Sequence, residues 1–498
     1  LSYLTTFNNI HHLDFLAGYE IDDTYNDYLS GEAYNFTTPD KHAISNGMKT
    51  VSVGGSDSRY RLVSYLSRLN YDYKNKYYLG ASFRVDGSSR LHRDNRWGTF
   101  WSVSGAWRTI EEEFMQPVKD WLTDLRIRAS YGVNGTLPSD YFGYMGLSSI
   151  SGGYLEQPGI QMSQIANPNL KWETNYNMNI GLDFGFWDRL NFTIEYYTRT
   201  TKNLLMDCPV SMTTGFSSYL MNIGEVKNKG IELTINSTNI KIKDFSWNTT
   251  FNLGHNSNKV VKLDGEQTQI VSGTQIHKVG SSYRTFYVQE FAGINPETGN
   301  PLFYTNELDE NGNYIKEITE NSKNAQFIPY KHAEPTVNGG ISNSLRYKWL
   351  DLNFLFSYQF GGYSYDTWAQ KTEHGGYDSY ANIPTYYRDS WKKPGDQTNI
   401  EVYMPGKSSS VSMHKITSSR RIHSTDYFRL KNITFGITLP KEWTNKINIG
   451  NVRFYASASN LWTWAAYDNY DPEAVSAGSA TQTTPPLKTV TFGLNINF

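Results

Sequence analysis

The ring-bearing side chains of one glycine-containing segment are the residues of this sequence best suited to bind a ligand. The segment covers residues 361–380, and its rings belong to Tyr363, Tyr365, Trp368, His374, Tyr377 and Tyr380. Aromatic rings stack on the apolar faces of sugars, while Asn, Gln and Asp side chains hydrogen-bond to hydroxyl groups. The candidate substrate-binding residues are therefore Tyr363, Tyr365, Trp368, Tyr377 and Tyr380. Packing of these rings within their own loop is the alternative interpretation.

Metal and thiol chemistry have little support in the sequence. Residues 309–313 place oxygen-bearing side chains at alternate positions around a glycine, as calcium loops do, but no acidic residue closes the pattern, which favours a polar turn. His11 and His12 are adjacent, and adjacent residues of a strand point to opposite faces. Cys208 is the only cysteine, so no internal disulfide can form, and we interpret it as an unremarkable loop or strand residue. No metal or cofactor is expected.

Enzymatic and nucleic-acid functions are not supported either. The sequence contains no nucleophile elbow, no HExxH motif and no phosphate-binding glycine loop followed by a helix. Its 46 basic and 48 acidic residues give a net charge of −2, which offers no electrostatic reason to bind nucleic acid. We therefore expect a protein that is not an enzyme.

The elements that would carry the candidate residues are strands, and the clearest of them lies at the end of the chain. Residues 489–498 read TVTFGLNINF, in which apolar and polar side chains alternate without interruption. Successive side chains of a strand point to opposite faces, so one face is apolar and the other polar. A strand of about 9–11 residues crosses a membrane in a β-barrel. The apolar residues expected to form the barrel-assembly signal are Phe492, Leu494, Ile496 and Phe498. The last strand of a soluble sandwich would show the same pattern.

Several other segments repeat this alternation, which strengthens the barrel interpretation. They are residues 77–85, 125–133, 176–186, 190–196, 245–253 and 350–360. Aromatic residues make up 15% of the chain although hydrophobic residues reach only 38%, and Tyr and Trp are enriched where barrels meet the membrane interfaces. No run of 18 apolar residues is present, which excludes a transmembrane helix. The sequence therefore predicts an all-β protein, a transmembrane antiparallel β-barrel.

The connections between the predicted strands alternate between short and long. The long ones lie near residues 134–173, 201–229, 256–335, 361–425 and 462–487. Outer-membrane barrels place short turns in the periplasm and long loops outside the cell. Counting strands with this rule predicts fourteen, beginning near residues 13–21 and 59–73. We also expect a small periplasmic helix at residues 111–121 and a short strand at residues 282–291 within a loop.

Many segments, in order, resemble the SusC/RagA family of TonB-dependent outer-membrane transporters. The similar segments are RVDGSSRL (84–91), NRWG (95–98), WSVSGAWR (101–108), LRIRASYG (125–132), NPNLKWET (167–174), NIGEVKNKGIE (222–232), GINPETGNPLFY (293–304), DYFRLKNIT (426–434), YDPE (470–473) and PLKTVTFG (486–493). They extend over nearly the whole chain. The resemblance implies that residues 1–498 are the carboxyl-terminal part of a barrel, about 14 of about 22 strands, with the plug domain absent from this chain.

The resemblance also implies a function and partners. It implies uptake of oligosaccharides or peptides across the cell outer membrane, together with a SusD-like lipoprotein and with energy from the TonB complex acting on the plug region. A TonB-dependent receptor for a metal chelate or another small nutrient, without a SusD-like lid, is the first alternative. A secreted β-rich adhesin is the second.

Overall fold

The computed structural model describes most of the 498 residues. The described ranges are 1–41, 43–154, 157–263, 268–376, 382–405, 416–447, 449–480 and 483–497, without the side chains of residues 50, 51, 151–158 and 447. The chain divides into two compact units. The first comprises Leu1–Arg108, Arg128–Asn179 and Arg199–Glu225, and the second comprises Thr109–Ile127, Ile180–Thr198 and Val226–Phe498.

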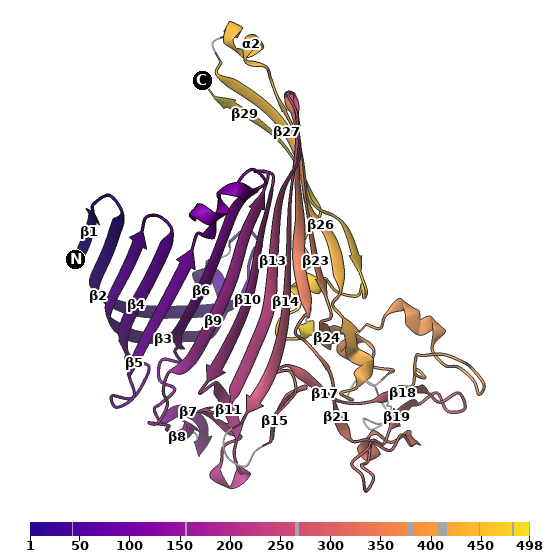
Figure 1. Ribbon diagram of the computed structural model, residues 1–498. Coiled ribbons are helices and arrows are strands. Elements are labelled where there is room, and N and C mark those ends of the chain that lie inside the picture. Colours follow the sequence, from indigo (N-terminus) through magenta and orange to yellow (C-terminus); the bar gives the residue numbers. More distant parts are fainter. Residues whose placement is uncertain are drawn as a thin grey trace. The chain divides into compact units, whose positions relative to one another are not determined.

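One sheet contains fifteen strands of the described residues, and its spatial order follows the chain from β1 to β29 (Figure 1). The strands are β1 (Ser2–Phe7), β2 (His11–Phe36), β3 (Gly47–Tyr73), β4 (Tyr77–Ser88), β5 (Trp97–Trp107), β6 (Leu122–Thr136), β9 (Glu173–Phe186), β10 (Leu190–Lys202), β13 (Glu225–Lys241), β14 (Phe245–Lys262), β22 (Val337–Tyr347), β23 (Leu350–Phe360), β26 (Tyr427–Thr438), β27 (Asn451–Ala465) and β29 (Thr489–Asn497). Pairs such as β22–β23 and β27–β29 are antiparallel. The all-β, antiparallel barrel class predicted from the sequence is confirmed.

The sheet differs from the predicted strand set at its start. The sequence predicts fourteen strands, and the sheet contains fifteen in the described residues. The additional strand is β1, which pairs with β2 from Ser2↔Leu16 to Phe7↔His11. Strands β2 and β3 have 26 and 27 residues, more than twice the length that crosses a membrane. Their far halves are rich in Asp, Ser and Gly, which weakens the apolar alternation on which the predicted bounds depended.

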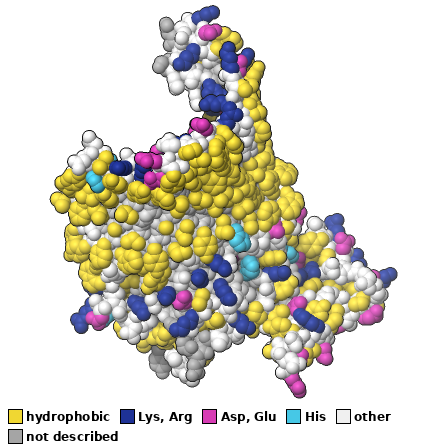
Figure 2. Space-filling view, in the orientation of Figure 1, with side chains coloured by type: hydrophobic (Ala, Val, Ile, Leu, Met, Phe, Trp, Pro, Cys, Tyr) yellow, Lys and Arg dark blue, Asp and Glu magenta, His cyan; other side chains and the backbone are white. Residues whose placement is uncertain are grey.

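The outward face of the strands carries aromatic rows in the first unit. One row joins Tyr19, Tyr65 and Trp97, with ring centroids 5.1 and 6.3 Å apart, and another joins Tyr73, Tyr77 and Trp107, at 6.2 and 6.4 Å. Tyr65 and Tyr73 lie eight residues apart on β3, about 26 Å along a strand. That distance is comparable with the apolar band of about 25 Å between the aromatic girdles of outer-membrane barrels. Figure 2 shows hydrophobic side chains gathered over the strands.

The opposite face of the strands is polar. In the first unit, Arg84 Nε donates to Asp86 Oδ1 at 2.6 Å and its Nη2 donates to Ser64 Oγ at 2.8 Å. In the second unit, Arg453 Nη2 donates to Asp351 Oδ2 at 2.7 Å. An apolar outer face opposite a charged and hydroxylated face is the side-chain distribution of a membrane barrel wall.

The connections contain smaller elements. The strands are β7 (Leu147–Tyr154), β8 (Gln157–Gln164), β11 (Leu205–Pro209), β12 (Ser218–Asn222), β15 (Gln269–Ser272), β16 (Gln275–Lys278), β17 (Thr285–Gln289), β18 (Phe291–Ile294), β19 (Pro301–Tyr304), β20 (Ile318–Thr319), β21 (Phe327–His332), β24 (Tyr363–Asp366), β25 (Ile422–Ser424) and β28 (Ser479–Ala480). The helices are α1 (Thr367–Thr372) and α2 (Lys441–Thr444), with 3-10 turns η1 (Ile44–Asn46), η2 (Thr109–Glu111), η3 (Glu113–Val118), η4 (Met212–Thr214), η5 (Ser322–Asn324), η6 (Thr385–Asp389), η7 (Ser419–Arg421), η8 (Asn445–Ile447) and η9 (Pro472–Ala474).

Two of these elements correspond to segments singled out in the sequence. The predicted strand at residues 282–291 is β17. The predicted helix at residues 111–121 is instead the pair of 3-10 turns η2 and η3, and Pro117 lies inside η3. Proline lacks the N–H that an α-helix needs at that position. None of the helices in the described ranges has the length and apolar character that crossing a membrane requires.

The last strand permits a matched test of its two faces. Phe492 of β29 is 81% exposed and lies opposite Ala456, whereas the adjacent Thr491 points to the other face. Phe492→Arg is expected to destabilise the barrel by about 2–4 kcal/mol, because it places a charge in lipid, and Thr491→Arg should cost much less. The measurement is the fraction of heat-modifiable, folded protein across a urea series in lipid vesicles. Equal losses in the two variants would contradict the assignment of the faces.

Candidate functional site

The predicted aromatic segment begins with the short strand β24. This strand pairs antiparallel with β25, through Tyr363↔Ser424, and parallel with β28, through Asp366↔Ala480. Helix α1 follows directly, because Asp366 is its N-cap and its Oδ1 accepts a hydrogen bond from the backbone N–H of Ala369 at 2.7 Å. The strand and the capped helix together fix the positions of the first three candidate aromatic residues.

The three described candidates have different surroundings. Tyr365 is 1% exposed and packs in a core cluster with Phe286, Val288 and Ile422, so its ring faces are covered by protein. Tyr363 is half-buried against the same cluster, and Lys331 Nζ lies 5.3 Å from its ring centroid. Trp368 is half-buried and lines a cavity. Tyr377 and Tyr380 lie outside the described residues, as does Phe498 of the predicted assembly signal.

The cavity beside Trp368 has a volume of about 670 Å³. We call it the strap cavity, because one of its walls is the segment of residues 466–480, the strap. Its other walls come from β26 and β27, through Arg429, Asn460 and Thr463, and from Pro485 and Lys488. The strap contributes Asp468, Asn469, Tyr470 and Asp471. A cavity of this size, with aromatic residues and several polar groups, is within the range of sites that bind small ligands.

The carboxylate of Asp366 holds one end of the strap. Asp366 is fully buried, and its Oδ2 accepts hydrogen bonds from Tyr467 Oη and Asn469 Nδ2, each at 3.0 Å. The backbone N–H of Tyr365 donates to Gly478 O at 2.8 Å. Asp366 therefore joins the start of α1 to the strap, and it satisfies the requirement that a buried carboxylate be hydrogen-bonded.

Arg429 of β26 holds the middle of the strap. Its side chain is 3% exposed, its Nη2 lies 2.6 Å from Asp471 Oδ2, and its Nη1 forms an ion pair with Glu473. Arg429 Nε also donates to Thr463 Oγ1 at 3.0 Å, and Lys431 Nζ lies 2.8 Å from Glu473 Oε2. Buried ion pairs need this degree of hydrogen bonding to offset the loss of hydration. Both segments, 426–434 and 470–473, stand out in the sequence, but nothing in the sequence indicates that they pair.

Burial shifts the pKa values of the groups around Asp366. Burial raises the pKa of Tyr470 to about 12, and burial together with the carboxylate of Asp366 raises the pKa of Tyr467, so both phenols are neutral at neutral pH. Burial lowers the pKa of His423 to about 4, with a smaller opposing effect from Asp366. The neutral His423 ring stacks on Tyr467 with centroids 3.7 Å apart and planes 4° apart.

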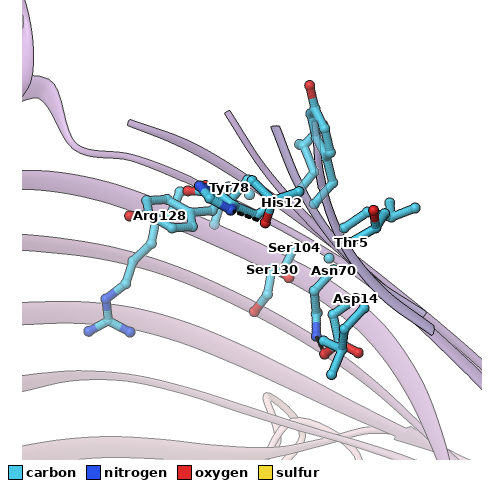
Figure 3. A pocket seen from close by; sticks show the side chains of 18 of the residues that line it. Thr5, His12, Asp14, Asn70, Tyr78, Ser104, Arg128 and Ser130 are labelled. Atoms are coloured by element: carbon cyan, nitrogen blue, oxygen red, sulfur yellow. Dashed lines mark hydrogen bonds and ion pairs between the residues drawn. The ribbon is translucent and has the colours of Figure 1, made fainter. Parts of the chain in front are cut away.

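A second cavity lies within the first unit, and we call it the strand-face cavity. Its volume is about 820 Å³, and its polar lining comes from the strands between β1 and β9 (Figure 3). Thr6 Oγ1 and His12 Nδ1 are 3.0 Å apart, His12 Nε2 lies 3.6 Å from Asp72 Oδ1, and Asn70 Nδ2 donates to Asp14 Oδ2 at 3.2 Å. The two adjacent histidines point apart, as their neighbouring positions on a strand predict, because His11 instead contacts Tyr71 Oη at 2.7 Å. Strand alternation could have predicted this cavity only if the strand register had been known.

The remaining residues considered for chemistry have structural surroundings. Asp309 Oδ1 accepts hydrogen bonds from the backbone N–H groups of Asn311, at 2.9 Å, and Asn313, at 2.8 Å, and these bonds lower the pKa of Asp309. The carboxylate therefore closes the turn of its own loop. Cys208 is buried in β11, opposite Tyr219 of β12. The described residues include no group of three or more His, Cys, Asp or Glu side chains arranged to hold a metal ion.

Comparison with known proteins gives consistent matches. Residues 2–286 match the family model described as TonB dependent receptor-like, beta-barrel. The whole chain is 32% identical to TonB-dependent receptor P3 of Formosa agariphila, and covers 52% of that protein. It is 30% identical to TonB-dependent receptor SusC of Bacteroides thetaiotaomicron over 95% of this chain and 47% of SusC. A solved structure of the RagAB peptide transporter matches all of this chain and 54% of its own, with a TM-score of 0.87 and 27% identity. The chain thus spans about half the length of these relatives.

Proposed function

Because the chain belongs to the TonB-dependent receptor β-barrel family, we propose that it forms the carboxyl-terminal barrel part of a transporter that imports oligosaccharides or peptides. The family consists of outer-membrane proteins, and the chain lies in the outer membrane. In the whole protein, a SusD-like lipoprotein would cover the extracellular mouth and the TonB complex would supply energy through a plug region. The observation that carries this proposal is the similarity to SusC and to the RagAB transporter over nearly the whole chain.

The strap cavity supports a polyhydroxylated or amide-rich substrate better than a small anionic chelate. Trp368 and Tyr470 supply rings, and Asn460, Thr463 and Asp468 supply hydrogen-bonding groups. An anionic chelate would need an excess of basic groups, but the described lining contains Asp366, Asp468 and Asp471 against Arg429 and Lys488. Arg429 is moreover already paired with two carboxylates. We therefore favour oligosaccharide or peptide uptake over the alternative of a metal-chelate receptor, and we propose Trp368 as a substrate-contacting residue. Tyr363, Tyr377 and Tyr380 remain proposed substrate-binding residues, and Tyr365 would support the site from the core.

The strand-face cavity is suited to contact another part of the whole protein and not the substrate. Its carboxylates, hydroxyls and Arg128 lie on the polar face of the strands, where a plug domain of the whole protein would lie. We propose that this cavity contacts the plug. The side-chain oxygens of Asp72 are buried and accept no hydrogen bond from the described residues, so a donor from a packed segment would be favourable there.

Uptake by the complete protein tests the proposal. Cells that express the whole receptor with its lipoprotein partner are supplied with radiolabelled malto-, xylo- and manno-oligosaccharides or with a labelled tryptic peptide mixture. We expect uptake of one class, abolished when TonB is deleted. Trp368→Ala should raise the half-saturating concentration by about 3- to 10-fold, the value of one lost stacking contact. The control is Trp443→Ala, since Trp443 is 60% exposed on α2 and does not line the cavity.

Two results would count against the proposal. Uptake of an iron chelate alone, without either polymer class, would favour the small-nutrient receptor. Equal kinetics of the Trp368 and Trp443 variants would exclude the strap cavity as the substrate site.

A further inference from the structure

A separate groove lies in the connection between β14 and β22, where two small sheets form. One sheet has the order β15–β16–β17–β21 and the other has the order β18–β19–β20. Each of strands β17 and β21 places a more exposed aromatic ring beside a buried residue. On β17, Phe286 and Val288 are fully buried, and Tyr287 between them is half-buried. On β21, Ile328 is buried and its neighbour Phe327 is 40% exposed. The outer face of these two strands therefore presents aromatic rings, where polar side chains are usual.

Tyr287 and Phe327 form an aromatic floor. Their ring centroids lie 5.5 Å apart with planes at 35°, and Tyr287 pairs with Pro329 across the strands. Both rings line a groove of about 560 Å³, which we call the loop-sheet groove. The two tilted rings present apolar surface against which a flat, apolar face of a ligand can pack.

A short hairpin forms the wall of the groove. Leu308 and Tyr314 pair across it, and the backbone N–H of Asn306 donates to Ile315 O at 3.0 Å. The backbone N–H of Gln326 donates to Thr305 O at 2.7 Å, which ties the hairpin to the start of β21. Tyr314 is 43% exposed and adds a third ring to the groove. The wall is thus held in place by backbone hydrogen bonds and needs no ligand to form.

The polar groups of the groove carry no net charge. Its exposed polar lining comprises two amides, Gln269 and Gln326, with one acid, Glu307, and one base, Lys278. Three rings beside neutral amides suit a ligand with apolar ring faces and many hydroxyl groups. A charged peptide or an anionic polymer would require an excess of one charge, which these side chains do not supply.

We propose that the loop-sheet groove is a second ligand site, which binds a neutral oligosaccharide by stacking on Tyr287, Tyr314 and Phe327. Gln269 and Gln326 hydrogen-bond to its hydroxyl groups. The groove shares no lining residue with the strap cavity, so the two sites can be inactivated separately. The inference rests on the proposed function only in placing the groove outside the cell, since its binding chemistry is tested without transport. Such a site would hold a polymer at the surface before it enters the barrel.

Direct binding to the purified full-length protein tests the site. The probes are fluorescently labelled maltohexaose, cellohexaose, xylohexaose and mannohexaose, measured by fluorescence polarisation in detergent. We expect at least one hexasaccharide to bind, and Phe327→Ala and Tyr314→Ala each to raise its Kd about 3- to 10-fold. The matched control is Tyr330→Ala, because Tyr330 lies on the same strand, is also 40% exposed and does not line the groove. Heat-modifiability confirms that each variant is folded.

The outcomes separate this inference from the proposed function. Loss of binding in the Phe327 variant and retention in Trp368→Ala support the groove, whether or not the protein proves to import the sugar. Binding that depends on Trp368 and not on Phe327 overturns the groove and leaves the proposed function intact. Absence of binding by all four hexasaccharides also overturns the groove. A third result would also overturn the groove. If the Phe327 variant binds the sugar normally but no longer captures the lipoprotein partner, the same surface is a protein interface.

Discussion

Arg429→Met is expected to lower the free energy of unfolding of the full-length protein by about 3–5 kcal/mol and to release the strap. The substitution leaves Asp471 and Glu473 beside the barrel wall without their arginine, and Asp471 is 9% exposed. Removing one partner of a buried ion pair costs more than the pair contributes, because the remaining charge is buried without compensation. Lys431 reaches only Glu473, so Asp471 would lose its ion pair.

Two further variants separate this effect from a general loss of charge. Arg429→Lys keeps the charge but cannot bridge both carboxylates in a fork, so it should recover only part of the stability. Arg453→Met breaks an ion pair with Asp351 on the same polar face, but both partners there are 22–28% exposed, and a smaller loss of about 1 kcal/mol is expected. Urea titration in vesicles measures stability, and limited proteolysis within residues 466–480 measures release. If Arg429→Met and Arg453→Met lower the free energy of unfolding equally, the buried contacts of Arg429 with the strap contribute no more to stability than a partly exposed ion pair does.

The strap also shows what could be predicted from the sequence. Strand alternation has a period of two and depends only on near neighbours, so most strands of the large sheet could be predicted from residues alone. The exceptions are β1 and the far halves of β2 and β3, where the alternation is weak. The pairing of Arg429 with Asp471 and Glu473 joins residues more than forty positions apart. It depends on the path of a long connection, for which the sequence carries no periodic signal. The two segments stood out only through their resemblance to a family.

The aromatic candidates show the same limit at the level of single side chains. The sequence identified a segment rich in rings, and Trp368 does line a cavity. Tyr365, two residues along β24 from Tyr363, is buried because the connections build their own core around Phe286 and Val288. Residue type cannot distinguish a ring that supports a site from a ring that contacts the ligand. The loop-sheet groove was missed for a related reason, since its rings are dispersed between residues 287 and 327 and meet only in the folded sheet.

Acidification is expected to loosen the strap through His423. The pKa of His423 is about 4 in the folded protein, mainly because burial disfavours the charged ring. Asp366 attracts the charged ring less strongly than burial disfavours it, and Arg421 and Arg420 add smaller repulsions. The ordinary value of 6.5 applies when the strap is released. Between these values the released state binds a proton that the packed state does not. The stabilisation is therefore complete above pH 6.5 and is lost as the pH falls toward 4.

The size of this effect follows from the pKa difference. Each pH unit below the ordinary pKa of 6.5 removes about 1.4 kcal/mol of the stability of the packed strap, so about 2 kcal/mol is lost at pH 5. Partial exposure of the His423 ring reduces the expected loss to about 1–2 kcal/mol. Proteolysis within residues 466–480 should thus be about 5- to 30-fold faster at pH 5 than at pH 7.5. The measurement uses an acid-stable protease, and the cleavage rate of an unfolded substrate at each pH corrects for the pH dependence of the protease itself. His423→Gln should remove most of that acceleration, because glutamine does not titrate, and His332→Gln, in β21, should retain it. Retention of the full acceleration in His423→Gln would assign the acid sensitivity to the carboxylates Asp366, Asp471 and Glu473, whose protonation also weakens the strap contacts.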